Sequence, residues 1–271
     1  MVRSALVALA VAALVAGCGR AAAPPPTTPK QLRQFQVVFP EGFTRAQMIE
    51  RVGVVAKIAA RKKHHAVALN SRTYALSTRR AKIPCFTPPQ RRNLEGFLFP
   101  ATYDFLATTT SRELAADQLE TFCKNWNQVN LAYAKSKNLT PYDVLIIASM
   151  VEKETLAPDE RPKVAAVIYN RLHEHMPLGI DATLRYGLHI PPTQSILQSQ
   201  LESSNPYNSR RLTGLPPTPI ANPGLASIQA AAHPAKVDYL YFVRKPDKVH
   251  HFFTASDTAF AQYECAHGYG C

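Results

Sequence analysis

The sequence lacks the ligand spacings of the common zinc sites. It has 5 cysteines and 9 histidines, but no Cys-x-x-Cys pair and no His-Glu-x-x-His segment occurs among them. Both spacings bring two metal ligands within reach of one ion, so their absence argues against a structural or a catalytic zinc site. The sequence therefore predicts no metal site.

An apolar run long enough to cross a membrane as a helix is also missing near the start of the chain. The run there extends from Ala5 to Ala16 and follows a basic residue, Arg3. A spanning helix needs about 20 apolar residues, whereas the core of a signal peptide is shorter. The run is therefore typical of an export signal.

A possible lipidation site follows this run. Residues 15–18 read Val-Ala-Gly-Cys, which resembles a bacterial lipobox, in which the cysteine becomes the lipid-modified first residue of the mature chain. We expect residues 1–17 to be a signal peptide, Cys18 to be lipidated, and the proline- and alanine-rich residues 18–34 to form an extended tether. A plain signal peptide or a short anchor is the alternative.

Acidic residues are few. The chain has 19 Asp and Glu against 31 Lys and Arg, which gives a formal net charge of +12 at pH 7. Such an excess favours a negatively charged partner, such as an anionic membrane surface, a wall polymer or nucleic acid. Because we expect the chain to be exported, we expect no nucleic-acid partner.

Cysteine is scarce, and its number fits an oxidising compartment. Four cysteines remain if Cys18 carries a lipid: Cys85, Cys123, Cys265 and Cys271. An even number in an exported chain favours disulfides over free thiols. Cys85 could pair with Cys123, and Cys265 with Cys271, but four cysteines allow three pairings and the sequence does not choose among them.

What remains is the composition of a globular protein. With 46% apolar residues in 271, the chain can bury the core of one large or two modest domains. From Phe35 the pattern predicts a strand, a Pro-Glu-Gly turn and then a helix with Thr44 as its N-cap and Met48 and Val52 on its apolar face. A further short helix is possible at 54–60, and a long one is expected from Ser111 to about residue 134.

The strongest local signal lies at residues 140–155, which read TPYDVLIIASMVEKET. Thr140 can accept hydrogen bonds as an N-cap, Pro141 suits the first helical position, and Asp143 completes a capping box. The sequence therefore predicts a helix that begins at Pro141.

This helix presents an acidic residue at the end of an apolar face. Ile147, Met150 and Val151 share one stripe, and Glu154 is the next position on it. Burial and the negative end of the helix dipole both favour the protonated carboxyl, which is the form that a general acid needs. The alternative is a merely polar last turn, in which Glu154 caps a loop or pairs with Arg161.

Four ordered blocks of sequence carry a resemblance to a known family. They read LEGFLFPATYDF, IIASMVEKET, ERPKVAAVIYNRL and GLPPTPIANPGLASIQAAAHPAKVDYLYFV. Together they resemble the endolytic murein transglycosylase (YceG-like) family. In that family the second glutamate of the EKET block resembles the catalytic glutamate of lysozyme-like lytic transglycosylases. The resemblance assigns that role to Glu154.

The resemblance implies an α+β fold in two lobes. A small LysM-like α/β lobe is expected at residues 35–90, followed by a mainly helical, lysozyme-like catalytic domain at 91–271. That domain is expected to contain a short antiparallel strand pair, formed by residues 237–243 and 251–254. The LysM-like lobe could bind sugar or could only brace the catalytic lobe.

Polar and aromatic residues in the matching blocks and loops are candidates for contacts with the sugar. They are Glu95, Asp181, Thr183, Tyr186, Tyr207, Asn208 and Asn222. An aromatic ring can stack on a pyranose while an amide or carboxylate binds its hydroxyl and N-acetyl groups.

Structural roles remain open for several of these candidates. Glu95 could instead be a hydrogen-bond acceptor at a joint of the fold, and Asp181 could cap a short helix. Tyr207 and Asn208 could serve turn formation only. Family members tend to have Gln where Gly179 stands here, so one expected amide contact is missing.

The activity implied by the resemblance is cleavage of peptidoglycan between N-acetylmuramic acid and N-acetylglucosamine, with formation of a 1,6-anhydro end. One carboxyl suffices for this reaction, and no cofactor is implied. Partners would be glycan strands, the cell membrane through the lipid anchor, and the synthases of cell elongation. Three alternatives stay open: a muramidase that adds Glu95 or Asp181 as second carboxylate, a non-catalytic wall-binding lipoprotein, and a transport-type solute-binding lipoprotein. The last is the weakest, because the sequence shows no pair of βαβ-rich lobes.

Overall fold

The computed structural model describes residues 34–64, 66–88 and 93–269, which belong to one compact unit of the chain. The expected signal peptide, the lipidated Cys18 and nearly all of the tether at 18–34 lie outside the described residues. Among the helices that are described, none combines the length and the apolar character needed to cross a membrane.

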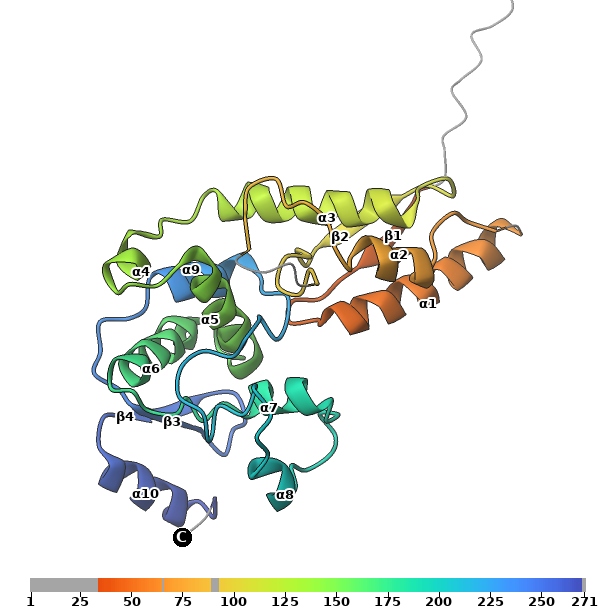
Figure 1. Ribbon diagram of the computed structural model, residues 1–271. Helices are drawn as coiled ribbons and strands as arrows, with labels where there is room; N and C mark the ends of the chain where they lie inside the picture. Colours follow the sequence, from red (N-terminus) through yellow and green to blue (C-terminus); the bar gives the residue numbers. More distant parts are fainter. Residues whose placement is uncertain (1–33, 65, 89–92, 270–271) are drawn as a thin grey trace, which may run out of the picture. The chain divides into compact units, whose positions relative to one another are not determined.

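The described residues fold into helices and two short antiparallel strand pairs, which confirms the α+β class (Figure 1). In chain order the elements are β1 (Phe35–Val38), α1 (Arg45–Lys63), α2 (Ser71–Ser77), β2 (Thr102–Phe105), α3 (Ser111–Trp126), α4 (Ala132–Ser136), α5 (Pro141–Glu154), the 3-10 helix η1 (Pro158–Glu160), α6 (Arg161–His173), α7 (Asp181–Leu188), α8 (Gln198–Leu201), α9 (Leu225–Ala232), β3 (Tyr241–Arg244), β4 (His251–Thr254) and α10 (Asp257–Ala266).

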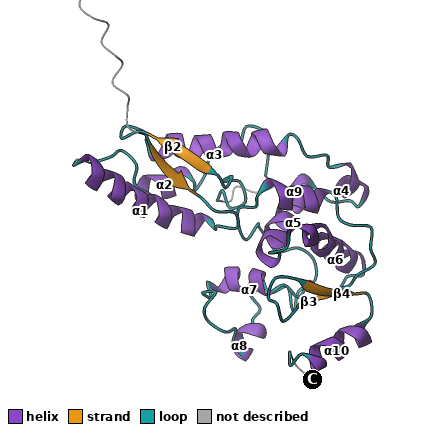
Figure 2. Cartoon of the chain, turned by 180° about the vertical axis from the view of Figure 1, so that it is seen from behind, coloured by secondary structure: helices purple, strands orange, loops and turns teal. Residues whose placement is uncertain are grey.

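The first part of the fold joins segments from both sides of residue 90. β1 pairs with β2 in antiparallel register, with Phe35 opposite Phe105, while α1 packs against α2, and α2 against α3 (Figure 2). The boundary expected at 90/91 therefore falls between two strands that pair with each other. Helix α1 runs to Lys63 without a break, so the separate helix considered at 54–60 is its second half.

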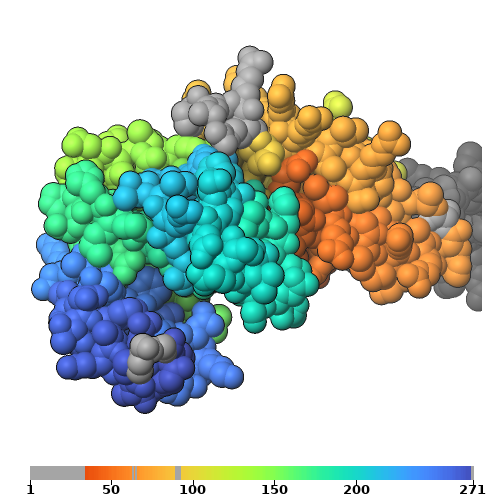
Figure 3. Space-filling view, turned by 60° about the horizontal axis from the view of Figure 1, so that its bottom comes forward, coloured from red at the N-terminus to blue at the C-terminus, as the bar shows by residue number. Residues whose placement is uncertain are grey.

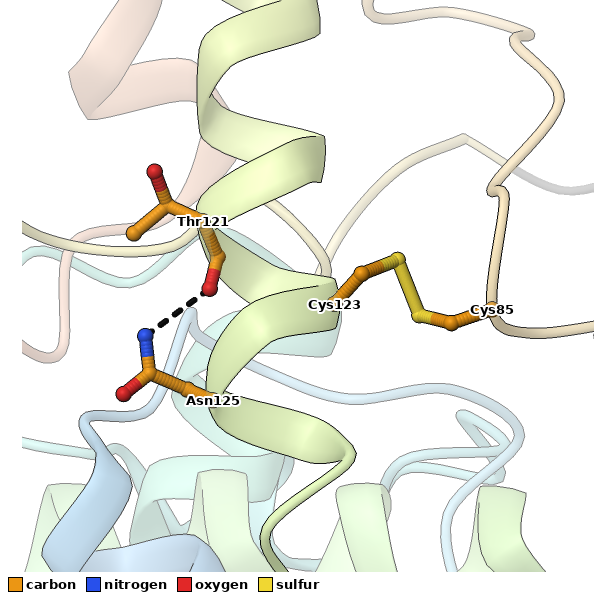
Figure 4. The surroundings of a disulfide bond; sticks show 4 residues. All are labelled: Cys85, Thr121, Cys123 and Asn125. Carbon is orange, nitrogen blue, oxygen red and sulfur yellow. Dashed lines mark hydrogen bonds between the residues drawn. A yellow bond between two sulfur atoms is a disulfide. The ribbon is translucent and has the colours of Figure 1, made fainter.

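A disulfide fixes the connection between α2 and β2 onto α3. Cys85 is bonded to Cys123 with a Cα–Cα distance of 5.5 Å (Figure 4). This is one of the three pairings that the sequence left open. Cys271, the proposed partner of Cys265, lies outside the described residues.

Helix α3 ends earlier than the sequence suggested. It stops at Trp126, and a turn at Asn127 separates it from the short helix α4. Its last residues bury their rings in an aromatic cluster: Trp126 stacks on Phe122 at 5.5 Å, and both lie against Phe86. Packing of these rings outweighs the helical propensity of the following residues, so the helix ends where the cluster ends.

Helix α5 forms the centre of the second part. The predicted capping box is present, because the Thr140 hydroxyl accepts from the Asp143 amide and the Asp143 carboxylate accepts from the Thr140 amide. Helices α6 and α9 pack on α5 and on each other (Figures 1 and 2). All residues from Tyr142 to Val151 except Asp143 are buried, so the helix is covered on every side and not only along the predicted stripe.

The last part of the described chain is the expected hairpin and a covering helix. β3 and β4 pair with Arg244 opposite His251, and α10 packs on both strands. The first strand begins at Tyr241, later than the residue 237 expected from its apolar pattern. The residues before it are bound to α6 instead, because the Asn170 side chain donates hydrogen bonds to the carbonyls of Val237 and Tyr239.

Candidate functional site

Glu154 is the last residue of α5 and lies where α5 leaves the core. Its side chain is half-buried, and the next residue, Thr155, ends the helix in an extended conformation. Glu152 points to another side, where it accepts a hydrogen bond of 3.0 Å from the backbone amide of Gly224 at the start of α9. The side chains of Glu152 and Glu154 therefore point to different sides of α5, as the helical geometry predicted.

Burial changes the chemistry of the Glu154 carboxyl. Loss of hydration is the largest influence and raises its pKa to about 7. The positive charge of Arg244 opposes this shift, the negative charge of Asp181 adds to it, and the Ala182 amide and Lys153 oppose it. Glu154 therefore keeps its proton up to neutral pH.

The neighbours of Glu154 come from two elements that Arg171 holds together. Its guanidinium donates from Nε to the Leu240 carbonyl at 2.6 Å, just before β3, and from Nη1 to the carbonyls of Pro177 and Leu178 at 3.0 and 2.9 Å, just before α7. Arg171 thus ties together the segments that lead to Arg244 and to Asp181.

Gly179, just before α7, lies against the guanidinium of Arg171. Gly179 has a φ of +69°, and a Cβ added there would lie 2.9 Å from Nη1 of Arg171. A side chain at this position would be strained and would press on the guanidinium.

The start of α7 is fixed by a second group of contacts. Thr183 is buried, donates to the Ile180 carbonyl at 2.7 Å, and shares a hydrogen bond of 2.8 Å with Ser209. Asp181 remains partly exposed and forms an ion pair with Arg210. Of these two predicted sugar contacts, only Asp181 is open to solvent.

Tyr186 on α7 lies against Tyr207, which belongs to the loop after α8. The rings of Tyr186 and Tyr207 lie 5.2 Å apart, and both side chains are half-buried. The Tyr207 hydroxyl shares a hydrogen bond of 2.7 Å with Thr218, while Tyr186 donates to Glu95 at 3.2 Å. The structure therefore brings four of the predicted site residues together: Tyr186, Tyr207, Glu95 and, through its bond to Glu95, Asn222.

Glu95 lies at a joint between distant segments. Its carboxylate accepts from the backbone amide of Arg45 at 2.9 Å, from Asn222 at 2.9 Å and from Tyr186. Only 3% of the residue is exposed, and desolvation raises its pKa to about 7 despite these donors. The bonds match the alternative that the sequence left open, an acceptor at a joint of the fold.

Asn222 completes this joint and is fully buried. Its Oδ1 accepts from the amides of Gly96 and Leu98, each at 2.9 Å, and its Nδ2 donates to the Phe43 carbonyl and to Glu95, also at 2.9 Å each. One side chain therefore connects the turn before α1, the turn at Glu95 and the proline-rich loop.

Asn208 is buried as well. Its Nδ2 donates to the carbonyls of Leu201 and Ser203 at 2.9 and 2.7 Å, and its Oδ1 accepts from the Arg210 amide. These bonds fix the loop after α8, so Asn208 does not face the space around Glu154.

The structure adds residues that the sequence reasoning did not select. Arg244 and the Ala182 amide act on Glu154, and no sequence motif marks either of them. His251, whose role the sequence left undefined, is buried and pairs with Glu160 at 2.7 Å, which attaches the β3–β4 hairpin to the start of α6. Only the close approach of separate segments reveals these contacts.

The surface is hollowed between two segments that supply neighbours of Glu154. Figure 3 shows this hollow between the segment that contains α7 and α8 and the segment that contains β3 and β4. Two cavities of about 440 Å³ each lie elsewhere, one beside β1 and α1, the other beside α6 and α9. Neither is lined by Glu154.

The joint at Asn222 gives a prediction about stability. Replacement of Asn222 by Ala removes four hydrogen bonds and leaves the Gly96 and Leu98 amides without an acceptor. We expect the free energy of unfolding in urea to fall by roughly 2–4 kcal/mol. Asn130→Ala, at an exposed turn with one local bond, is the control and should cost less than about 1 kcal/mol. Equal stability of Asn222→Ala and the unmodified chain would contradict the assignment.

Comparison with known proteins places this arrangement in a family. The sequence matches the model of the YceG-like family over residues 10–264. It is 35% identical over 222 residues to the endolytic murein transglycosylase of Bacillus subtilis strain 168, which covers 78% of this chain and 59% of that protein. It is 33% identical over 224 residues to the protein of the same name from Streptococcus pneumoniae strain R6, at 76% and 40% coverage.

A solved structure agrees with this match. The crystal structure of a putative yceG-like protein from Listeria monocytogenes superposes with a TM-score of 0.69 at 25% identity, over 84% of this chain and 75% of that one. The chain spans 59% and 40% of the length of the Bacillus and Streptococcus relatives. With its four sequence blocks, its α+β fold and a family match over most of its length, the chain belongs to the YceG-like family.

Proposed function

We propose that this protein is an endolytic lytic transglycosylase of peptidoglycan. It cleaves the bond between N-acetylmuramic acid and N-acetylglucosamine within the glycan strand and leaves a 1,6-anhydro muramyl end. Membership of the YceG-like family and the names of the Bacillus and Streptococcus relatives support the proposal. The observation that carries it is Glu154, a carboxyl at the end of the buried helix α5 with a pKa raised to about 7.

Glu154 acts twice in the proposed reaction. It first donates its proton to the glycosidic oxygen, so that the bond from this oxygen to C1 of the muramyl residue breaks. As a carboxylate it then takes the proton from the muramyl C6 hydroxyl, whose oxygen bonds to C1. A pKa near the working pH suits both steps, because the group must give and regain one proton.

The substrate supplies its own nucleophile. The C6 hydroxyl belongs to the same sugar ring as C1, so its attack needs no bound water and no second protein carboxylate. This matches the position of Glu95, which is buried and bonded to three protein donors. A muramidase would require a second carboxylate that is free to activate water or attack C1.

We divide the predicted sugar-binding residues by their exposure. Asp181, Tyr186 and Tyr207 are partly exposed and are proposed to contact the glycan. The others are buried and bonded within the protein, and we propose that they hold the walls of the site: Glu95, Thr183, Asn208 and Asn222.

The proposed place of action is outside the cytoplasm, on peptidoglycan strands. Cys18 would attach the chain to the cell membrane after removal of residues 1–17, and residues 18–34 would give the catalytic part its reach. The net charge of +12 suits both an anionic membrane surface and an anionic wall polymer. Association with the synthases of cell elongation is part of the same proposal.

Replacement of the proton donor tests this function. Glu154→Gln keeps the size of the side chain and removes its acidity, so we expect turnover of purified glycan to fall roughly 100- to 10,000-fold while the chain stays folded. Glu152→Gln is the matched control on the same helix and should keep near-normal turnover, because the amide still offers an oxygen to the Gly224 amide. Wild-type turnover in Glu154→Gln would refute the assignment.

The products of the unmodified enzyme are analysed in the same experiment by mass spectrometry. Muramyl ends should have the mass of the anhydro form. Ends heavier by one water would identify a hydrolase, and retention of glycan without any product would identify a non-catalytic binding protein.

The pH dependence follows from the direction of the Glu154 shift. Its pKa lies above the ordinary 4.5, so the active protonated form persists to about pH 7, and kcat/KM should fall as pH rises further. Arg244 lowers this pKa, so Arg244→Gln should move the fall to higher pH. Asp181 raises it, so Asp181→Asn should move the fall to lower pH. Profiles that fall at the same pH in all three proteins would contradict this account.

A further inference from the structure

Arg244 is an exposed cation on the β3–β4 hairpin, and Arg171 ties the residue before this hairpin to the start of α7. Arg244 is the last residue of β3, and its charge acts on Glu154 more strongly than any other charge does. Within the part of the chain that the structure describes, its guanidinium forms neither a side-chain hydrogen bond nor an ion pair. A charged donor at this place is therefore available to a ligand.

The acids near Arg244 are bound to other bases. Asp181, at the start of α7, pairs with Arg210. On the hairpin itself, Asp247 accepts from the backbone amides of Val249 and His250 and pairs with the His250 ring at 3.0 Å.

A third acid, Glu160, is also engaged. It is buried against His251, the residue opposite Arg244 in the strand pair. Glu154 itself must be neutral when it donates its proton, so at that moment it offers Arg244 no counter-charge. The positive charge of Arg244 is thus uncompensated in the form of the enzyme that meets the substrate.

We propose that Arg244 binds a carboxylate carried by the muramyl side of the glycan, next to the bond that is cleaved. This rests on the proposed function, because it names which chemical group of that substrate the site recognises. Muramic acid differs from glucosamine by the lactyl group on O3, which ends in a carboxylate when no peptide is attached. When a stem peptide is attached, it is joined through the lactyl carboxyl. The carboxylates close to the muramyl residue then belong to the peptide.

The geometry suits this group of ligands. A guanidinium binds a carboxylate with two parallel N–H donors, and charge-assisted bonds of this kind are among the strongest polar contacts. Arg171 holds the residues before β3 through the Leu240 carbonyl, so the strand that carries Arg244 is fixed relative to α7. Arg244 would therefore select the muramyl residue and orient it over Glu154.

Binding tests this proposal without dependence on turnover. The full chain with Glu154→Gln is the background, because its neutral amide stands for the protonated acid and the glycan should stay intact. The dissociation constant is measured by calorimetry at pH 6 for three glycans: stem-free strands with free lactyl carboxylates, the same strands with these carboxylates converted to amides, and strands that keep their peptide stems.

We expect the amide-capped strands to bind about 10- to 100-fold more weakly than the carboxylate strands. The additional change Arg244→Gln should weaken the carboxylate strands by a similar factor and leave the amide-capped strands nearly unchanged. Stem-bearing strands that respond to Arg244→Gln as stem-free ones do would identify a peptide carboxylate as a second source of the ligand group.

Lys248→Gln is the matched control, because it removes the same charge from an exposed position of the same hairpin. It should change binding less than twofold. Equal losses for Lys248→Gln and Arg244→Gln, or equal weakening of carboxylate and amide-capped strands by Arg244→Gln, would overturn the proposal. The proposed transglycosylase activity would stand in either case, because it is judged by anhydro products from the unmodified enzyme.

Discussion

Desolvation of a single carboxyl at the end of a buried helix is the constraint on which the proposed chemistry depends. Helix α5 is covered by α6 and α9 up to Val151, and Glu154 at its end is half-buried. Burial and the negative end of the helix dipole both disfavour its charge. Among the residues that the structure describes, none forms a direct ion pair with Glu154, and the proton therefore stays on the carboxyl to about pH 7.

The surroundings of this carboxyl come from segments far apart in sequence, and fixed polar contacts hold them in place. Arg171 binds carbonyls before β3 and before α7, while Asn222 and Glu95 connect the first part of the fold to the proline-rich loop. Such joints consist of buried polar groups with all partners supplied by the protein. We infer that they give the site its rigidity, whereas Arg244 remains free for ligands.

Local signals predicted the central helix well. The capping box at Thr140 and the apolar run after it determine α5, and the apolar pattern of the last strands predicted the hairpin that ends at Thr254. The family resemblance, which the match over residues 10–264 confirms, led to Glu154. These features could be predicted because each depends on residues close together in the chain.

Contacts between distant segments could not be predicted in this way. The pairing of β1 with β2, the choice of Cys123 as partner of Cys85, and the action of Arg244 on Glu154 arise only when the chain is folded. The same holds for Glu95, whose type fits a sugar contact as well as a joint, because only its buried surroundings in the folded chain favour the joint.

The central claim concerns the proton on Glu154, and a direct titration tests it most simply. With glutamate labelled by carbon-13 at the side-chain carboxyl, the NMR signal that disappears in Glu154→Gln belongs to this residue. We predict that its chemical shift changes with a midpoint near pH 7. A midpoint near 4.5, the ordinary value for a solvated glutamate, would contradict the account.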